Sequence, residues 1–533
     1  MKNFFLVFAL LIPLLAGRPA LADGFERGLE AAQKGNFTAA LTEWKPLADQ
    51  GDPRAQYNLG KLYEQGSGVP QSWETALSWY NKAAQQGFAY AQHTLGVMYN
   101  EGISVPKDYE KALKWYQLAT EQGSANAQYS LARMYAKGTG VSTDYKTAFK
   151  LYSLSAEQGH AIAQAALGAL YAGGSGVKQD DNLAAKWMYE SARQGDETGL
   201  SFLRMLANSG NGFGQYALGL MNYRGQGLEQ NYDEAHKWFS LAAEQGVDDA
   251  QNKLGTIYFR GLGNTQKNFA VAHKWFTLAA EQGLTDAQSN LGLLYFHGYG
   301  VNQDFEAAKT WYTDAANQGH AEAQVSLGTG YLYGNGWVQN HELAFKWISM
   351  AAKQKQVQAQ YELGKIYFYG FGRPKDIETG INWFSLAAEQ GSPEAQFALG
   401  QISYSSKDYN KALEWLTPAA QQGNTGALNN LGVMYFKGQG LDQNFEAALN
   451  LYTLAAERGH GPSQISLGSM YFKGQGVTKD NIRAYMWMDI AAQLGEEWGV
   501  KNRNMIKEQM SSAQIGEAQE LSLKCVQKNY VNC

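Results

Sequence analysis

The chain has 533 residues, too many for one ordinary core, so several domains or one array of repeats is expected. Hydrophobic residues make up 45% of the sequence and aromatic residues 13%, which excludes an intrinsically disordered protein. The formal net charge of −5 gives no indication of a basic groove, so we expect no nucleic-acid partner.

Residues 1–22 have the pattern of a secretory signal peptide. Lys2 supplies the positive start, an apolar run extends from Phe4 to Ala16, and Ala20-Leu21-Ala22 is a small-x-small cleavage site. An uncleaved anchor helix is the alternative, but thirteen apolar residues are fewer than the roughly 20 that span a bilayer. We therefore expect an exported chain with no stable membrane insertion after cleavage.

Residues 23–51 are predicted to form a capping helix pair, and the repeats start after it. A Leu recurs along the chain, and Gly follows it every time except at Ala132. Eight of the eleven gaps are 36 residues, and the others are 51, 37 and 32. The repeat Leu residues are Leu59, Leu95, Leu131, Leu167, Leu218, Leu254, Leu291, Leu327, Leu363, Leu399, Leu431 and Leu467. Such regular self-similarity predicts a stack of supersecondary units.

Each repeat is predicted to be two helices. The first carries apolar residues four before and three after the Leu, and it ends in a Gly-x-Gly turn such as Gly66-Ser67-Gly68. The Gly next to Leu has no side chain and lets a neighbouring helix approach closely. The second helix has a central Trp in ten units, and we expect this Trp to belong to the buried stripe. Neighbouring pairs must stack to bury these faces.

Three departures from the pattern divide the array. Residues 196–213 interrupt it with an orphan helix predicted over 200–207, between repeats 1–4 (residues 52–195) and repeats 5–12 (residues 214–495). This interruption is either a hinge or a tolerated insertion. The turn at 405–408 is four residues short, and Lys355 replaces a helix-ending Gly, so we expect that helix to end differently.

Residues 496–533 are predicted to form a C-terminal capping helix and a tail with the only two cysteines. In an oxidising compartment Cys525 and Cys533 can close a small loop. A free thiol or an intermolecular link is the alternative.

The repeat resembles the Sel-1-like repeat, a relative of the tetratricopeptide repeat. The residues that carry the resemblance are Ala-x-x-x-Leu-Gly-x-x-Tyr-x-x-Gly-x-Gly, then Lys-Ala-x-x-Trp-Tyr-x-x-Ala-Ala-x-x-Gly, and they cover about residues 52 to 495. The resemblance implies an all-α, right-handed α-solenoid of about twelve antiparallel helix pairs, whose first helices line a concave binding surface. The tail is similar to the ends of bacterial exported members, which implies a periplasmic or secreted protein.

No catalytic constellation is recognisable, so we expect no enzyme activity and no cofactor or metal. The histidines fall on repeat positions, and His160, His320 and His460 are expected in exposed, solvated turns. Some relatives that carry a Cys pair in each repeat are described as acting on β-lactams, but this chain lacks those pairs.

Binding is therefore the expected function, with an unknown protein or peptide as the partner. The position two before the repeat Leu carries the aromatic candidates for partner contact, namely Tyr57, Tyr129, Tyr216, Tyr361 and Phe397. The alternative is that these rings pack between neighbouring first helices. Lys61, Arg133 and Lys365 add positive charge nearby. A module that binds cell-wall glycan and an enzyme acting on β-lactams or peptidoglycan are the other functional hypotheses.

Overall fold

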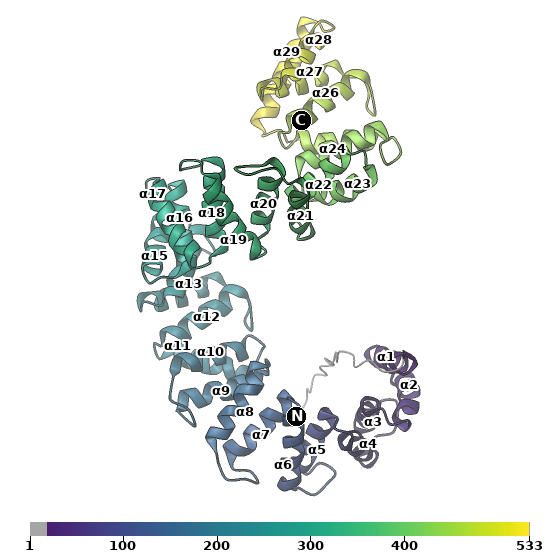
Figure 1. Ribbon diagram of the computed structural model, residues 1–533, viewed down its shortest axis with the longest axis vertical. Coiled ribbons are helices and arrows are strands. Elements are labelled where there is room, and N and C mark those ends of the chain that lie inside the picture. Colours follow the sequence, from purple (N-terminus) through teal and green to yellow (C-terminus); the bar gives the residue numbers. More distant parts are fainter. Residues whose placement is uncertain (1–18, 532) are drawn as a thin grey trace. The chain divides into compact units, whose positions relative to one another are not determined.

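The computed structural model describes residues 19–531 and 533, which contain 29 α-helices and no β-strand (Figure 1). Consecutive helices pack in pairs, so the predicted all-α solenoid of about twelve repeats is confirmed. Residues 1–18 of the predicted signal sequence lie outside the described part. None of the described helices combines the length and the apolar character needed to cross a membrane.

Each repeat contributes a first and a second helix. The first helices are α3 Pro53–Gln65, α5 Ala89–Glu101, α7 Ala125–Lys137, α9 Ala161–Gly173, α12 Gly212–Arg224, α14 Asp248–Arg260, α16 Thr285–His297, α18 Ala321–Tyr333, α20 Val357–Tyr369, α22 Pro393–Ser405, α24 Thr425–Lys437 and α26 Gly461–Lys473. The second helices are α4 Trp73–Gln85, α6 Tyr109–Glu121, α8 Tyr145–Glu157, α10 Asp181–Ala192, α13 Tyr232–Glu244, α15 Phe269–Glu281, α17 Phe305–Asn317, α19 His341–Lys353, α21 Ile377–Glu389, α23 Tyr409–Gln421, α25 Phe445–Ala456 and α27 Asn481–Gln493.

The other helices stand outside the twelve pairs. They are α1 Pro19–Gln33 and α2 Phe37–Asp49 before the array, α11 Glu197–Asn208 within it, and α28 Glu497–Lys507 and α29 Ser512–Gln527 after it. The chain divides into two compact units, Met1–Ala279 and Ala280–Cys533. This division falls within α15, not at the interruption after repeat 4.

The two helices of a repeat touch where the Gly next to the repeat Leu meets the residue after the central Trp. A Cβ atom on Gly364 would lie 2.6 Å from Cδ1 of Phe384, and one on Gly219 would lie 2.6 Å from Cδ1 of Phe239. Both phenylalanines are fully buried. The predicted close approach at this Gly is therefore confirmed, and the group that it admits is the second helix's own aromatic ring.

The central Trp lies nearer the surface than expected. Only Trp79, Trp347 and Trp487 are buried, and the other seven are half-buried. The expectation of a uniformly buried Trp stripe was wrong, because the residue after Trp points toward the first helix while Trp packs back on the preceding pair. Lys side chains lie over several of these rings, as Lys346 does at 4.5 Å from the Trp347 centroid.

The Gly-x-Gly turns end the first helices as predicted. Gly66 and Gly68 have φ angles of 69° and 73°, a left-handed conformation that other residues adopt only with strain. At Lys355, by contrast, the expectation of a different helix end was wrong. The backbone keeps the turn that glycine makes elsewhere, and Lys355 adopts a φ of 64°.

A ladder of buried glutamines joins the repeats, which sequence analysis did not predict. The Gln three before the repeat Leu donates from Nε2 to a carbonyl at the end of the preceding helix, as Gln324 does to Ala316 at 3.0 Å. Its Oε1 accepts from the Gln that ends the second helix of its own repeat. Such pairs at 2.6–3.0 Å include Gln56–Gln86, Gln92–Gln122, Gln128–Gln158, Gln164–Gln194, Gln215–Gln245, Gln288–Gln318, Gln324–Gln354, Gln360–Gln390 and Gln396–Gln422.

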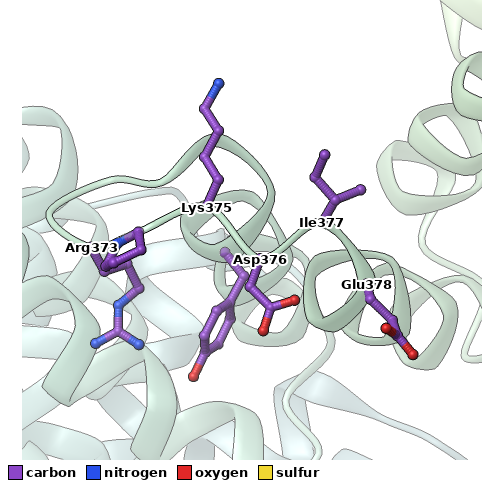
Figure 2. Close-up of a pocket in the computed structure, with 7 residues that line it drawn as sticks. Arg373, Lys375, Asp376, Ile377 and Glu378 are labelled. Carbon is purple, nitrogen blue, oxygen red and sulfur yellow. The ribbon is translucent and has the colours of Figure 1, made fainter.

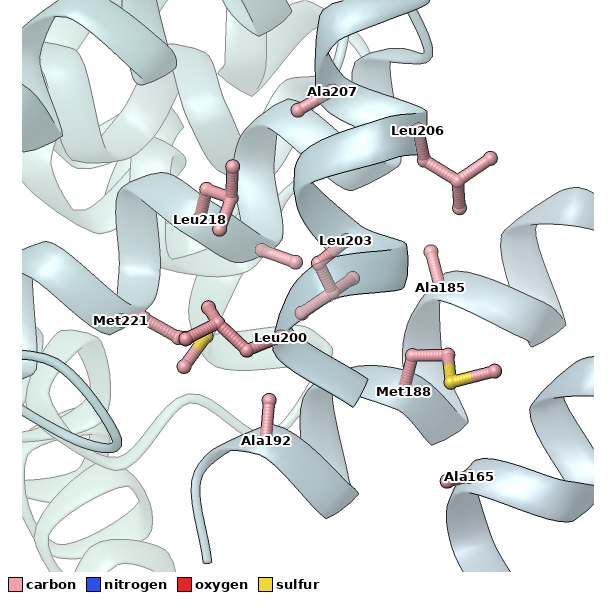
Figure 3. Packing of buried hydrophobic residues seen from close by; sticks show 11 residues of the cluster. Ala165, Ala185, Met188, Ala192, Leu200, Leu203, Leu206, Ala207, Leu218 and Met221 are labelled. Carbon is pink, nitrogen blue, oxygen red and sulfur yellow. The ribbon is translucent and has the colours of Figure 1, made fainter. Parts of the chain in front are cut away.

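Helix α11 is the orphan helix of the interruption, and it is part of the core. Leu200, Leu203 and Leu206 lie between residues of α10 and of α12, and Leu203 is fully buried (Figure 3). The carbonyl of Ala207 accepts from Gln215 at 3.2 Å, as the end of a second helix does elsewhere. The core is therefore continuous through the interruption.

Helix α28 resembles α11 in its sequence and in its packing. The sequence at 194–199, Gln-Gly-Asp-Glu-Thr-Gly, returns as Leu-Gly-Glu-Glu-Trp-Gly at 494–499. A Cβ on Gly199 would lie 2.9 Å from N of Ala192, and one on Gly499 would lie 2.8 Å from N of Ala492. Helix α11 thus has the form of a terminal cap placed inside the array.

The C-terminal cap consists of α28 and α29, where one helix was predicted. Asp489 of α27 anchors both, because it accepts from Arg503 at 2.9 Å and from Ser522 at 2.8 Å. A disulfide joins Cys525 and Cys533, whose Cα atoms are 5.3 Å apart.

Candidate interaction surface

The aromatic residues predicted to contact a partner lie on the first helices, but each packs within the array. Tyr57 lies against Phe88 at 5.5 Å between ring centroids, and Tyr129 stacks on His160 at 5.0 Å. Phe397 covers Gly426, where a Cβ would lie 2.5 Å from its Cζ. These three rings fill the space between neighbouring first helices.

Tyr216 and Tyr361 lie against the buried aromatic ring of their own second helix. Their ring centroids are 5.9 Å from Phe239 and 5.7 Å from Phe384. Burial, followed by the charge of Glu362, raises the pKa of Tyr361 to about 12. Both rings are half-buried, so each keeps an exposed part. A recognition role for the five rings stays a prediction, and it concerns their exposed parts only.

Three positions of each first helix define one surface: two before, two after and six after the repeat Leu. We call this surface the first-helix face. Its predicted positive charges all have acidic partners. Lys61 lies 3.9 Å from Glu64, Arg133 lies 3.2 Å from Glu101, and Lys365 lies 3.1 Å from Glu362. These three charges are therefore paired.

One cluster on this face joins the first helices of repeats 8 and 9. The Tyr333 hydroxyl donates to Glu362 at 2.5 Å, and Lys365 contacts the same hydroxyl. The Lys365 ammonium lies 4.8 Å from the Tyr333 centroid and 5.1 Å from that of Tyr361. Glu362 is buried, whereas Tyr333 is 42% exposed.

The chemistry of this cluster suits recognition. Burial, followed by the hydrogen bond to Glu362, raises the pKa of Tyr333 above the ordinary value. The phenol thus stays protonated at neutral pH, and the network fixes an exposed ring at little entropic cost. Sequence analysis missed Tyr333 and Glu362, although Tyr at the sixth position after Leu in repeats 8 and 9 (Tyr333 and Tyr369) was a visible signal.

The turn after α20 forms an open pocket of about 740 Å³, lined by Tyr367 and residues 373–378 (Figure 2). Asp376 begins α21 by accepting from the backbone N–H of Thr379 at 3.0 Å. That hydrogen bond holds the pKa of Asp376 below its usual value. The pocket thus contains a charged acceptor of fixed position.

The histidines cap helices, and the expectation of solvated turns was wrong. Nδ1 of His160, His320 and His460 accepts from the backbone N–H three residues on, at 3.1, 3.2 and 3.3 Å. All three are half-buried, and burial lowers the pKa of His160 and His460. Among the described residues, no group of three or more His, Cys, Asp or Glu side chains is placed to hold a metal ion.

Twelve matches to the Sel1 repeat family model span residues 53–196 and 212–496, with a one-residue gap at 356. The chain belongs to the Sel1 repeat family. Sel1 repeats commonly mediate protein–protein interaction, and scaffolds built from them are generally non-catalytic.

The solved structures similar to this chain include two Sel1 repeat proteins. One is c5321, a protective antigen of uropathogenic Escherichia coli strains, at 29% identity over 92% of this chain and 96% of that chain, with a TM-score of 0.41. The other is a Sel1 repeat protein from Oxalobacter formigenes, at 31% identity over 60% of this chain and 90% of that chain, with a TM-score of 0.40. No curated protein matches the chain.

Proposed function

We propose that this Sel1 repeat protein is an exported, non-catalytic scaffold that holds a protein or peptide partner on its first-helix face. The cluster of Tyr333, Tyr361, Glu362 and Lys365 is the observation that carries this proposal. It presents an exposed ring fixed by a buried carboxylate, and rigid tyrosines with a polar end are typical centres of protein interfaces. Burying a carboxylate costs free energy, so packing alone does not account for Glu362 at this position.

Export is proposed from the pattern of residues 1–22, and the Cys525–Cys533 bond supports an oxidising compartment. In a bacterial host we expect the mature protein in the periplasm or the medium. Mass spectrometry of the purified protein should then show an N-terminus at Asp23. An intact residue 1 in the cytoplasmic fraction would contradict this part of the proposal.

Site-specific photo-crosslinking tests the scaffold directly. A photoreactive residue at position 333 probes the first-helix face, and one at Leu386, which is 43% exposed on the second helix α21, is the matched control. We expect position 333 to crosslink a defined protein in cells and position 386 to crosslink none. The variant Lys365→Ala, which removes one side of the cluster, should reduce that crosslink.

The same experiment separates the other hypotheses. If the adducts at position 333 contain only wall glycan, the hypothesis of a glycan-binding module would replace that of a protein scaffold. A protein crosslinked equally from both positions would contradict the assignment of the face.

A further inference from the structure

The turn after α20 differs from its counterparts at one position. Six of the Gly-x-Gly-type turns carry Val after the second turn residue, as at Val69, Val141 and Val477, and two carry Leu. Repeats 6 and 8 have Asn264 and Trp337 there, and repeat 9 has Arg373, the one charged residue at this position. The aliphatic residue packs against the core in other repeats, as Val69 and Val141 do, so the fold of the turn does not require a charge at this place.

Arg373 is held in place by aromatic rings and lacks an acidic partner. Its guanidinium carbon lies 3.2 Å from the Phe345 centroid and 5.0 Å from that of Tyr367. Within the described residues it forms no ion pair or hydrogen bond through its side chain. Arg483 of repeat 12 also lies over a ring, Tyr471 at 5.7 Å, but it is paired with Asp480 at 3.7 Å.

The guanidinium of Arg373 and the carboxylate of Asp376 both line the pocket described above. Figure 2 shows the side chains of Arg373 and Asp376 extending to the same side of the turn, while Lys375 extends to the other. A half-buried cation and a fixed anionic acceptor therefore line one open depression of about 740 Å³.

The geometry points to a binding site for the C-terminal residue of a peptide. Its carboxylate pairs with the Arg373 guanidinium, whose planar fork matches a carboxylate with two parallel hydrogen bonds. The amide N–H of the same residue donates to the Asp376 carboxylate. The rings of Phe345 and Tyr367 fix the plane of the guanidinium before the ligand arrives.

Two features favour this ligand over other anions. Phosphate or sulfate brings two negative charges next to Asp376. The C-terminal residue of a peptide brings one, and its amide N–H is a donor that the Asp376 carboxylate can accept. A side-chain carboxylate of Asp or Glu stands farther from its own backbone N–H, so it would satisfy only Arg373. The pocket lies in a turn, outside the cluster at Tyr333, and its inference does not depend on the proposed first-helix face.

Nuclear magnetic resonance of the full chain with ¹⁵N-labelled arginine provides the test. The Nε–Hε signal of Arg373 is identified by its loss in Arg373→Val, which introduces the residue that other repeats have and should leave the turn folded. Titration with N-acetylalanine should shift the Arg373 signal to saturation, while the Arg483 signal, already paired, stays unchanged. N-acetylalanine amide, which lacks the carboxylate, should bind at least tenfold more weakly.

Two further titrations test whether the carboxylate must come from a peptide C-terminus and whether Asp376 takes part in binding. N-acetylaspartic acid α-amide represents a side-chain carboxylate and should also bind at least tenfold more weakly than N-acetylalanine. Asp376→Asn, which retains a helix-capping oxygen, should weaken N-acetylalanine several-fold and leave acetate unaffected. Equal shifts of Arg373 and Arg483, or stronger binding of inorganic phosphate than of N-acetylalanine, would overturn the inference.

Discussion

A buried glutamine in every repeat except repeat 11 holds the stack in register, because its amide can form hydrogen bonds with two neighbouring helices at once. The amide donates to the end of the preceding helix and accepts from the end of its own second helix. Each pair replaces water contacts that the interface removes. The ladder stops where the residues change. Repeat 11 has Leu428 and Arg458 in the two positions, and in repeat 12 the acceptor Gln464 faces Leu494.

The incomplete glutamine pair of repeat 12 offers a test of the ladder. Gln464 is fully buried and donates to Ala456 at 3.2 Å, but its Oε1 has no hydrogen-bond partner among the described residues. Leu494 is 46% exposed and stands where other repeats have the donor Gln. We expect Leu494→Gln to raise the free energy of unfolding by about 1 kcal/mol, because a buried acceptor becomes satisfied. The urea midpoint measures this, and Leu494→Ala is the control for the lost apolar contact. Equal midpoints for the two variants would disprove the ladder's contribution here.

Lys355 offers a second test on a single residue. It holds a φ of 64° where other repeats have Gly, a conformation that costs an L-residue about 1–2 kcal/mol. Because glycine also loses more entropy on folding, we expect Lys355→Gly to stabilise the protein by only about 0.5–1 kcal/mol. The same substitution at Lys353, the last residue of α19, should instead destabilise it, because this position is helical and glycine is a poor helix former. Thermal unfolding of both variants gives the comparison.

Among the helices, α11 can be used to test whether the interruption contributes to the stability of the core. Leu203 is fully buried between α10 and α12, so Leu203→Ala should destabilise its surroundings by about 2–5 kcal/mol. Met205 on the same helix is 57% exposed, and Met205→Ala should change little. Hydrogen exchange should show faster opening of α10–α12 in the first variant alone. Similar, small effects in both would indicate a loosely attached insertion.

Periodicity was enough to predict the helix pairs, because Leu, Gly and Ala recur at fixed spacing and each acts locally. It could not assign the burial of the second helix, since Trp311 and Tyr312 are adjacent aromatic residues. Only the packing shows that Tyr312 is buried and Trp311 half-buried. The cost of Trp311→Ala should therefore be smaller than that of Tyr312→Ala. The Tyr333 cluster depends on contacts between repeats, which a single repeat does not encode.

For the whole molecule, the similarity of the repeats makes their differences informative. Gly364 and Phe384, or Gln360 and Gln390, have counterparts in most repeats and maintain the fold. Glu362 and Arg373 have none that serve the same contact, and both lie in repeat 9 of the second compact unit. Functional specificity in this chain is thus expected where a repeat departs from its neighbours in a half-buried position.

Stability of the molecule should fall as the pH falls below neutral, because several histidines are partly buried in the neutral form. Burial, followed by the positive charges of His160 and Lys61, lowers the pKa of His93 to about 4 from 6.5. Burial also lowers the pKa values of His160, His236, His273 and His460. A folded pKa below the unfolded one means that the unfolded chain binds protons first. The contribution is therefore complete above about pH 6.5 and is lost between 6.5 and about 4.

His93 allows this effect to be isolated with a residue that the array already uses. It stands two before its repeat Leu, where Tyr57 and Tyr129 occur, and its Nε2 lies 3.1 Å from the Ser130 hydroxyl. We expect the free energy of unfolding of the wild type, measured by urea titration, to fall between pH 7 and pH 5. That of His93→Tyr should fall less, and the difference should be roughly 1 kcal/mol or more. The same slope in both proteins would mean that His93 is as accessible to protons in the folded chain as in the unfolded one. The remaining slope of the variant would then include the contributions of His160, His236, His273 and His460, whose pKa values burial also lowers.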